Sequence, residues 1–288
     1  METTRRSFIS TIAAAPLVAA AAPGRLPIKK AVEFSMIQPG NAPALDKFQI
    51  AKDAGFEEIE LPTMPDQAKA EEALAASKKT GIRIHSVMNQ EHWKSPLSSA
   101  DPAVVEKSME GMRTSLHNAK LWGADTVLLV PAVVDPVTPY ATAYERSQKQ
   151  IRKLIPLAKE LNVIIGIEEV WNKFLLSPIE FAKYIDEFQS PYIRAYFDVG
   201  NVAIQGYPHD WIRTLGKRIV KLHIKDFSFR KGTTAWNDLL VGDIDFKAVH
   251  AALSDIGYKG TATVELKGGN AEYLKDVNQR FEKILSGV

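Results

Sequence analysis

Cysteine is absent from this 288-residue sequence, which excludes disulfides, thiol nucleophiles and cysteine-ligated metals. An excess of charge is also missing. The formal net charge is only +2, so the sequence lacks the electrostatic signature of a protein that binds nucleic acid or anionic membranes. Beyond the N-terminal segment, no apolar run is long enough to span a bilayer. Hydrophobic residues make up 45% of the chain, which predicts a soluble protein with a substantial core.

The N-terminus has the pattern of an export signal. Arg5 and Arg6 precede a short, Ala-rich apolar stretch at 9–22 that ends in small residues. A basic start, a short apolar middle and a small-residue end are typical of a cleavable signal and not of a membrane span. The arginine pair resembles the twin-arginine signal, with an ordinary signal as the alternative. We therefore predict a signal at 1–25, one mature domain at 26–288, a periplasmic location and no membrane attachment after cleavage.

After this segment, short β-rich apolar runs alternate with longer helical patterns, several of which end at a glycine, as at Gly81 and Gly123. Eight strand–helix units in a chain of this length predict an α/β fold, a single (β/α)₈ TIM barrel. A doubly wound open sheet is the alternative, but the loop at 38–41 lacks the phosphate-binding glycine fingerprint that such a fold would need. The predicted strands are 31–37, 58–61, 83–87, 126–130, 163–167, 193–197, 219–224 and 260–264.

Ionisable residues stand at the ends of four consecutive predicted strands. Because the active site of such a barrel lies at the carboxyl ends of its strands, these side chains are expected to meet at one rim. Taken singly, each could be a helix cap or a solvated loop residue, but four on neighbouring strands favour a shared site. Two glutamates, an aspartate and a histidine suit one divalent ion, either Mn²⁺, Mg²⁺, Co²⁺ or Zn²⁺. The predicted ligands are Glu168, Asp198, His223 and Glu265.

The segments around these residues resemble the sugar phosphate isomerase/epimerase family, which has a xylose-isomerase-like barrel. The resemblance extends over nearly the whole mature chain, and its most specific segments are 167–172, 196–201, 221–226 and 264–265. It implies that the four ligands hold one metal ion. It also implies that Glu168 and Glu265 lie on opposite faces of a sugar, where one removes a proton beside the carbonyl and the other returns it.

Departures from the family pattern limit which reactions and substrates are expected. Many epimerases have a histidine where this chain has Asn201, and the same change breaks the trinuclear zinc set of the related abasic-site endonucleases, which disfavours DNA repair. No phosphate-gripping loop is evident, so a phosphorylated substrate is not implied. The predicted substrate-binding residues are polar or aromatic side chains near the same rim, namely Glu60, His85, His92, Trp171, Asn172, Asn201, Lys225 and Arg230.

The predicted function is that of a metal-dependent sugar isomerase or epimerase that works through an enediolate on a keto-sugar. A lyase or dehydratase that starts with the same proton abstraction and then expels a β-leaving group, for example from a 3-keto-glycoside, is the first alternative. A non-catalytic carbohydrate-binding barrel is the second, and the paired carboxylates speak against it. The predicted partner is a small carbohydrate and not a nucleic acid, and a homo-oligomer is left open.

Overall fold

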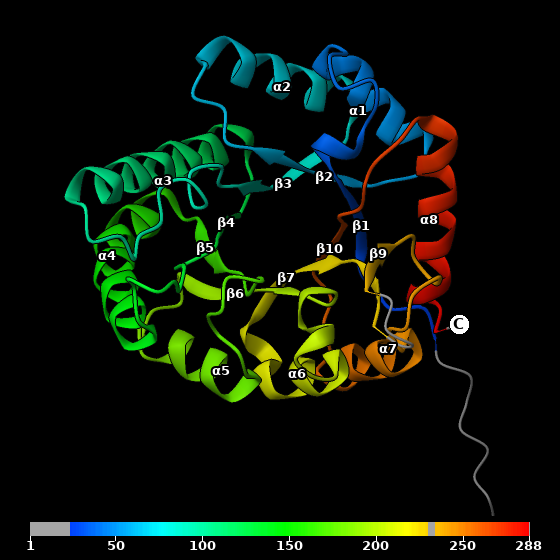
Figure 1. Ribbon diagram of the computed structural model, residues 1–288. Coiled ribbons are helices and arrows are strands. Elements are labelled where there is room, and N and C mark those ends of the chain that lie inside the picture. The colour runs from blue at the N-terminus through cyan, green and yellow to red at the C-terminus, as the bar shows by residue number, and fades with distance from the viewer. Residues whose placement is uncertain (1–23, 230–233, 288) are drawn as a thin grey trace, which may run out of the picture.

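Eight parallel strands close into a barrel in the computed structural model, which describes residues 24–229 and 234–287. Around the barrel the order is β1-β10-β7-β6-β5-β4-β3-β2, so each strand lies beside its neighbours along the chain (Figure 1). The predicted TIM barrel is therefore confirmed. The barrel strands are β1 (Lys29–Glu33), β2 (Glu58–Pro62), β3 (Arg83–Met88), β4 (Thr126–Leu129), β5 (Ile164–Ile167), β6 (Ile193–Asp198), β7 (Ile219–Ile224) and β10 (Thr261–Val264).

Helices form a ring around the barrel (Figure 1). They are α1 (Ala44–Asp53), α2 (Gln67–Thr80), α3 (Pro102–Trp122), α4 (Tyr140–Leu161), α5 (Pro178–Asp186), α6 (Pro208–Leu215), α7 (Phe246–Asp255) and α8 (Ala271–Leu285). Three 3₁₀ turns add η1 (Phe34–Met36), η2 (Asn201–Ile204) and η3 (Gly216–Arg218). In the described part of the chain, no helix combines the length and the apolar character that crossing a membrane would require.

Local signals in the sequence set several of these helix ends. Ser177 caps α5, because its side chain accepts the N–H of Glu180, and Pro178 occupies the first helical position. Gly81 and Gly123 end α2 and α3 with φ of 79° and 72°, a left-handed conformation that costs glycine little.

Two elements differ from the prediction. The first strand ends at Glu33 and not at residue 37, because the Glu33 side chain accepts the N–H of Ser35 and caps the turn η1. The chain after β7 forms an antiparallel hairpin of β8 (Asp226–Ser228) and β9 (Ala235–Asn237), which the sequence pattern did not indicate. The predicted signal falls largely on residues 1–23, outside the described residues, and stays a prediction.

The barrel interior is polar toward the end where the strands finish. His223 on β7 is fully buried and is paired in register with Asp198 on β6 and Thr263 on β10. Its neighbours Leu222 and Ile224 belong to the hydrophobic core, so alternation along the strand turns the imidazole into the barrel. Buried ionisable groups need partners, and the contacts of His223 show what these partners are.

Candidate metal centre and active-site cavity

Four side chains meet at the carboxyl end of the barrel, as the sequence predicted. Glu168 follows β5, Asp198 ends β6, His223 lies on β7 and Glu265 follows β10. One potential ligand atom from each lies within 4.8 Å of the others. Three of the four residues are buried, and the side chain of Glu265 is 28% exposed. The cluster is therefore mostly buried at the carboxyl end of the barrel, and Glu265 is on its solvent-accessible side.

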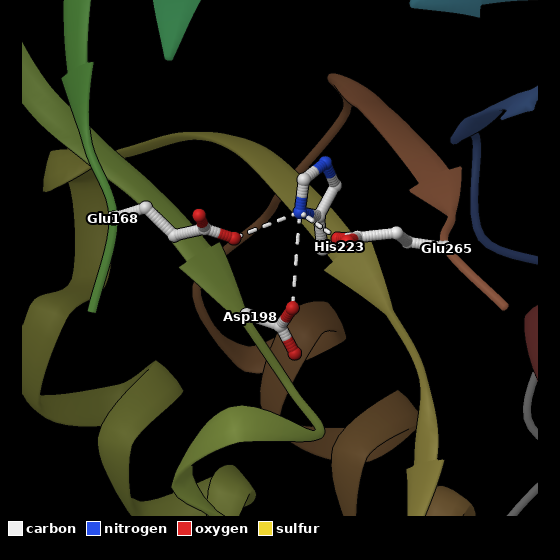
Figure 2. Close-up of side chains that lie close together, drawn as sticks. All are labelled: Glu168, Asp198, His223 and Glu265. Carbon is white, nitrogen blue, oxygen red and sulfur yellow. Dashed lines mark hydrogen bonds and ion pairs between the residues drawn. The ribbon is translucent and has the colours of Figure 1, made fainter. Parts of the chain in front are cut away.

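The imidazole nitrogen Nδ1 of His223 is the centre of this cluster (Figure 2). It lies 2.8 Å from Glu168 Oε1, 2.8 Å from Glu265 Oε2 and 3.7 Å from Asp198 Oδ2. Figure 2 shows the two glutamates approaching from opposite sides. A ring nitrogen offers either one proton or one lone pair, so it cannot satisfy three carboxylates at once.

Two further observations test whether these residues fit a metal ion. Asp198 Oδ2 is buried and accepts no hydrogen bond, although the Lys225 ammonium forms an ion pair with it at 2.9 Å. Burial opposes the charged form of His223, but the negative charges of Glu60, Glu265 and Glu168 prevail and raise its pKa well above the usual value. The site thus favours positive charge, and its three carboxylates and one imidazole suit a divalent ion.

The other imidazole nitrogen has a partner of its own. His223 Nε2 lies 3.2 Å from Glu60 Oε1, and both side chains are fully buried. Glu60 also accepts hydrogen bonds from the hydroxyls of Ser86, at 2.8 Å, and Tyr196. A carboxylate in this place holds the Nε2 proton, so that Nδ1 is the nitrogen that would give its lone pair to a bound metal ion. Glu60 was predicted to bind substrate, but it contacts Nε2 of His223, the nitrogen that does not face the other three members of the cluster.

The two glutamates of the cluster differ in electrostatics. Burial raises the pKa of Glu168 to about 7. Burial acts on Glu265 in the same direction, but Lys225, whose Nζ lies 2.9 Å from Glu265 Oε2, and His223 together hold the pKa of Glu265 well below its usual range. A pair of carboxyl groups whose proton affinities diverge in this way is common where an acid and a base share one reaction.

Glu169 is a buried neighbour of the site that the sequence prediction left without a role. Its Oε1 accepts the backbone N–H of Asp198 at 2.8 Å, and its own carbonyl accepts the amide of Asn201 at 3.0 Å. Oδ1 of Asp198 in turn accepts the N–H groups of Gly200 and Asn201. These hydrogen bonds fix the backbone and the carboxylate of Asp198. The adjacent pair Glu168-Glu169 was the available signal, since consecutive side chains point in opposite directions.

A cavity of about 200 Å³ lies above the cluster, with Glu168 and Glu265 in its wall. Four of the predicted substrate-binding residues border it: His92, Trp171, Asn201 and Lys225. Burial lowers the pKa of His92 to about 4, so this imidazole is neutral at neutral pH. Trp171 donates its indole N–H to the carbonyl of Asn201 at 2.9 Å, which fixes one aromatic wall.

Three other predicted substrate-binding residues, Glu60, His85 and Asn172, do not border this cavity. Glu60 and His85 are fully buried inside the barrel, where His85 Nε2 lies 2.9 Å from the hydroxyl of Thr263. Asn172 donates to the carbonyl of Ala132 and accepts the N–H of Phe174, so it shapes its own loop. Arg230 lies outside the described residues.

Trp236 borders the cavity and was missed by the sequence prediction. It stacks on Trp171 with the ring centroids 5.0 Å apart and the planes at 26°. Its side chain comes from β9 in the unpredicted hairpin, where a single tryptophan between turn residues gives no periodic signal.

Comparisons with known proteins agree with this architecture. A family model described as xylose isomerase-like TIM barrel matches residues 48–284. The L-ribulose-5-phosphate 3-epimerase UlaE from Escherichia coli O1:K1 is 24% identical over 241 residues, which cover 79% of this chain and 84% of the relative. The match confirms the family resemblance predicted from the sequence, and the epimerase names of the relatives confirm the predicted isomerase/epimerase class.

Solved structures show the same fold. The 3-keto-D-glucoside 4-epimerase YcjR from E. coli superposes with a TM-score of 0.74 at 15% identity, covering 89% of this chain and 99% of that chain. The IOLI protein, whose crystal structure has a binding zinc atom, superposes with a TM-score of 0.73 at 18% identity, covering 90% of this chain and 98% of that chain.

Proposed function

Because the chain belongs to the xylose isomerase-like TIM barrel family, we propose that it is a metal-dependent epimerase or isomerase that moves a proton beside the carbonyl of a keto-sugar. One observation carries the proposal. Carboxylate oxygens of Glu168 and Glu265 both lie 2.8 Å from the same imidazole nitrogen and approach it from opposite sides (Figure 2). Two carboxylates so placed can address opposite faces of one sugar carbon.

Glu168, Asp198, His223 and Glu265 would hold the metal ion, since one donor atom from each lies within 4.8 Å of the others and three of them are carboxylate oxygens. A bound divalent ion supplies a Lewis acid that polarises the substrate carbonyl and offsets the negative charge that develops on its oxygen. Its identity is Mn²⁺, Mg²⁺, Co²⁺ or Zn²⁺ in this proposal, and the zinc atom of the IOLI protein supports a divalent ion.

The proton transfer balances within the two glutamates. One carboxylate removes the proton from the hydroxyl-bearing carbon next to the carbonyl. The electron pair of the broken C–H bond forms a C=C bond and the π pair of the carbonyl moves onto its oxygen, giving an enediolate. The other carboxyl group, in its protonated form, then gives a proton to the opposite face of the same carbon, which inverts the centre and restores the carbonyl. If the proton goes instead to the former carbonyl carbon, and the hydroxyl proton of the first carbon passes to the former carbonyl oxygen, the carbonyl moves. Trp171 and Trp236 form an aromatic wall that would shield this step from water.

Solvent exchange tests this function. In D₂O with added Mn²⁺, the protein should incorporate deuterium at the carbon next to the carbonyl of a keto-sugar, detected by mass spectrometry and NMR. Glu265→Gln removes a proton-transfer group, so exchange should fall at least about a hundredfold. Asp198→Ala and His223→Ala should also lose bound metal in elemental analysis, whereas full metal occupancy in both would refute the site.

The product distinguishes the chemical alternatives. With a 3-keto-glycoside as substrate, an intact glycosidic bond and an inverted centre indicate epimerisation. Release of the aglycone indicates that the same proton abstraction leads to elimination, which was the first alternative. Unchanged turnover in Glu265→Gln would contradict either form of catalysis.

We also propose that residues 1–25 are a twin-arginine signal and that 26–288 form the exported, periplasmic enzyme. The first residue of this mature chain already contacts α8, since the N–H of Leu26 donates to the carbonyl of Leu285 at 2.8 Å. The test is the N-terminal residue of the protein in periplasmic fractions. We expect the unchanged chain to be exported. A variant that combines Arg5→Lys and Arg6→Lys should stay in the cytoplasm with its N-terminus intact.

A further inference from the structure

A second cavity of about 350 Å³ lies beside the first. The two share three wall residues, Lys225, Trp236 and Glu265, so they adjoin at the proposed reaction centre. The first cavity is smaller than the roughly 300–1,000 Å³ that pockets for drug-sized ligands occupy. It suits one sugar unit, and the second cavity offers space for another. The remaining walls of the second cavity are Asn237, Asp238, Leu266 and Lys267.

Trp236 borders both cavities and has the geometry of a stacking platform. It packs against Trp171 and, at 4.9 Å between ring centroids, against Phe227. Even so, 47% of the residue stays exposed, at the junction of the cavities. An indole held rigidly by other aromatic rings presents an apolar surface to a sugar ring or an aromatic group at little entropic cost.

The hairpin that carries Trp236 is anchored from below. The buried carboxylate of Asp226 accepts the N–H groups of Phe227, Val241 and Gly242 at 2.8 to 3.1 Å. Under the indole, a Cβ added at Gly200 would lie 3.0 Å from Trp236 Cζ3, so glycine permits this close approach. Trp236 is therefore held in two ways, by the hairpin that Asp226 anchors and by its close contact with Gly200.

The charges of the second cavity argue against a phosphate. In this fold the loops after the last two barrel strands often bind one. Among its described wall residues, however, each lysine is already matched with a carboxylate. Lys225 pairs with Glu265 at 2.9 Å and Lys267 with Asp238 at 3.6 Å. A phosphate would be repelled by both carboxylates and would have to break these pairs, whereas an uncharged group would not.

We propose that the substrate is a glycoside, with the keto-sugar in the first cavity and an uncharged glycosyl or aromatic unit in the second, against Trp236. This inference rests on the function proposed above, because it takes Glu168 and Glu265 as the groups that face the reacting sugar. It adds the substrate class, which the shared fold leaves undetermined.

Turnover provides the first test. Deuterium incorporation is compared for 3-keto-glucose, its phenyl β-glycoside and its 6-phosphate, all with the Mn²⁺-loaded protein. We expect kcat/KM for the glycoside to exceed that for the other two by about tenfold, the contribution of one aromatic contact. Trp236→Ala should bring the ratio of glycoside to free sugar close to one, and Trp236→Phe should keep part of it.

Two further variants guard against misfolding. Leu266→Trp fills the second cavity from another strand end and should lower the same ratio. Tyr207→Ala removes an aromatic side chain that is 72% exposed and borders neither cavity, and it should keep the unchanged protein's ratio. Equal kcat/KM for all three substrates, or a preference for the 6-phosphate, would overturn the inference while leaving the proposed proton transfer intact.

Calorimetric binding separates the two proposals when no exchange occurs. Phenyl β-glucoside, glucose and glucose 6-phosphate are unreactive probes of the same cavities. About tenfold tighter binding of the glycoside, lost in Trp236→Ala, supports the second subsite even if the catalytic proposal fails. Equal affinities, or tightest binding of the phosphate, refute it.

Discussion

The contact between Glu60 and His223 yields a quantitative prediction for metal affinity. In Glu60→Gln the side chain keeps its size and can still accept a hydrogen bond, but it loses the negative charge that lies 3.2 Å from Nε2. The imidazole then becomes a weaker donor at Nδ1, and its orientation is less firmly set. Loss of such a partner typically lowers metal affinity by about 10–100-fold, equivalent to about 1.4–2.7 kcal/mol.

The assay is a competition titration of Mn²⁺ or Zn²⁺ against a chromogenic chelator. Glu58→Gln is a matched control, because Glu58 is a buried glutamate two residues earlier on β2 that pairs with Lys29 and Arg83 at the opposite end of the barrel. It should lower stability without changing metal affinity. If Glu60→Gln binds the metal within twofold of the unchanged protein, Glu60 does not tune His223 and the reasoning is refuted.

Three other predictions follow from the same contacts. Gly200→Ala places a Cβ 2.6 Å from Lys225 Cβ and 3.0 Å from Trp236 Cζ3. This overpacking costs about 1–3 kcal/mol, so it should displace the Lys225 and Trp236 side chains and lower kcat/KM. An unaltered kcat/KM would contradict the packing at Gly200. Asp226→Asn turns an amide toward backbone N–H groups that need an acceptor, so thermal unfolding should show a loss of about 1–3 kcal/mol. Metal at a hundred times its Kd should stabilise the folded protein by about 2.7 kcal/mol, and Asp198→Ala should abolish that shift.

The convergence of the four candidate ligands could be predicted from the sequence because barrel geometry alone brings strand ends together. Asp198 and Glu265 follow apolar runs directly, and their strands are neighbours of β7, so the closed barrel leaves little freedom in where they meet. His223 was placed inward by alternation with its apolar neighbours. These inferences need only strand order and a period of two.

The partners of the cluster required distances that the sequence does not contain. Glu60 meets His223 across the barrel from a position 163 residues away, and neither periodicity nor a motif encodes that contact. The same limit applies to Asn172, which looked like a substrate ligand because it follows the site but spends its hydrogen bonds on its own loop. The position of Trp236 could not be predicted because its hairpin is held by the hydrogen bonds of Asp226 and not by a pattern of strand-forming residues.

Lys225 and Asp226 link the floor of the site to its outer wall. Lys225 directly follows β7 and Asp226 begins β8, and their side chains diverge. The ammonium reaches Asp198 and Glu265, and the carboxylate accepts the N–H groups of Val241 and Gly242. The loop that carries Trp236 is thus tied to the same backbone that positions the groups around the candidate metal site. A substrate unit that presses on the indole acts on a wall fixed one residue away from Lys225, so binding in the second cavity and proton transfer in the first are expected to be coupled, with remote contacts raising kcat as well as lowering KM.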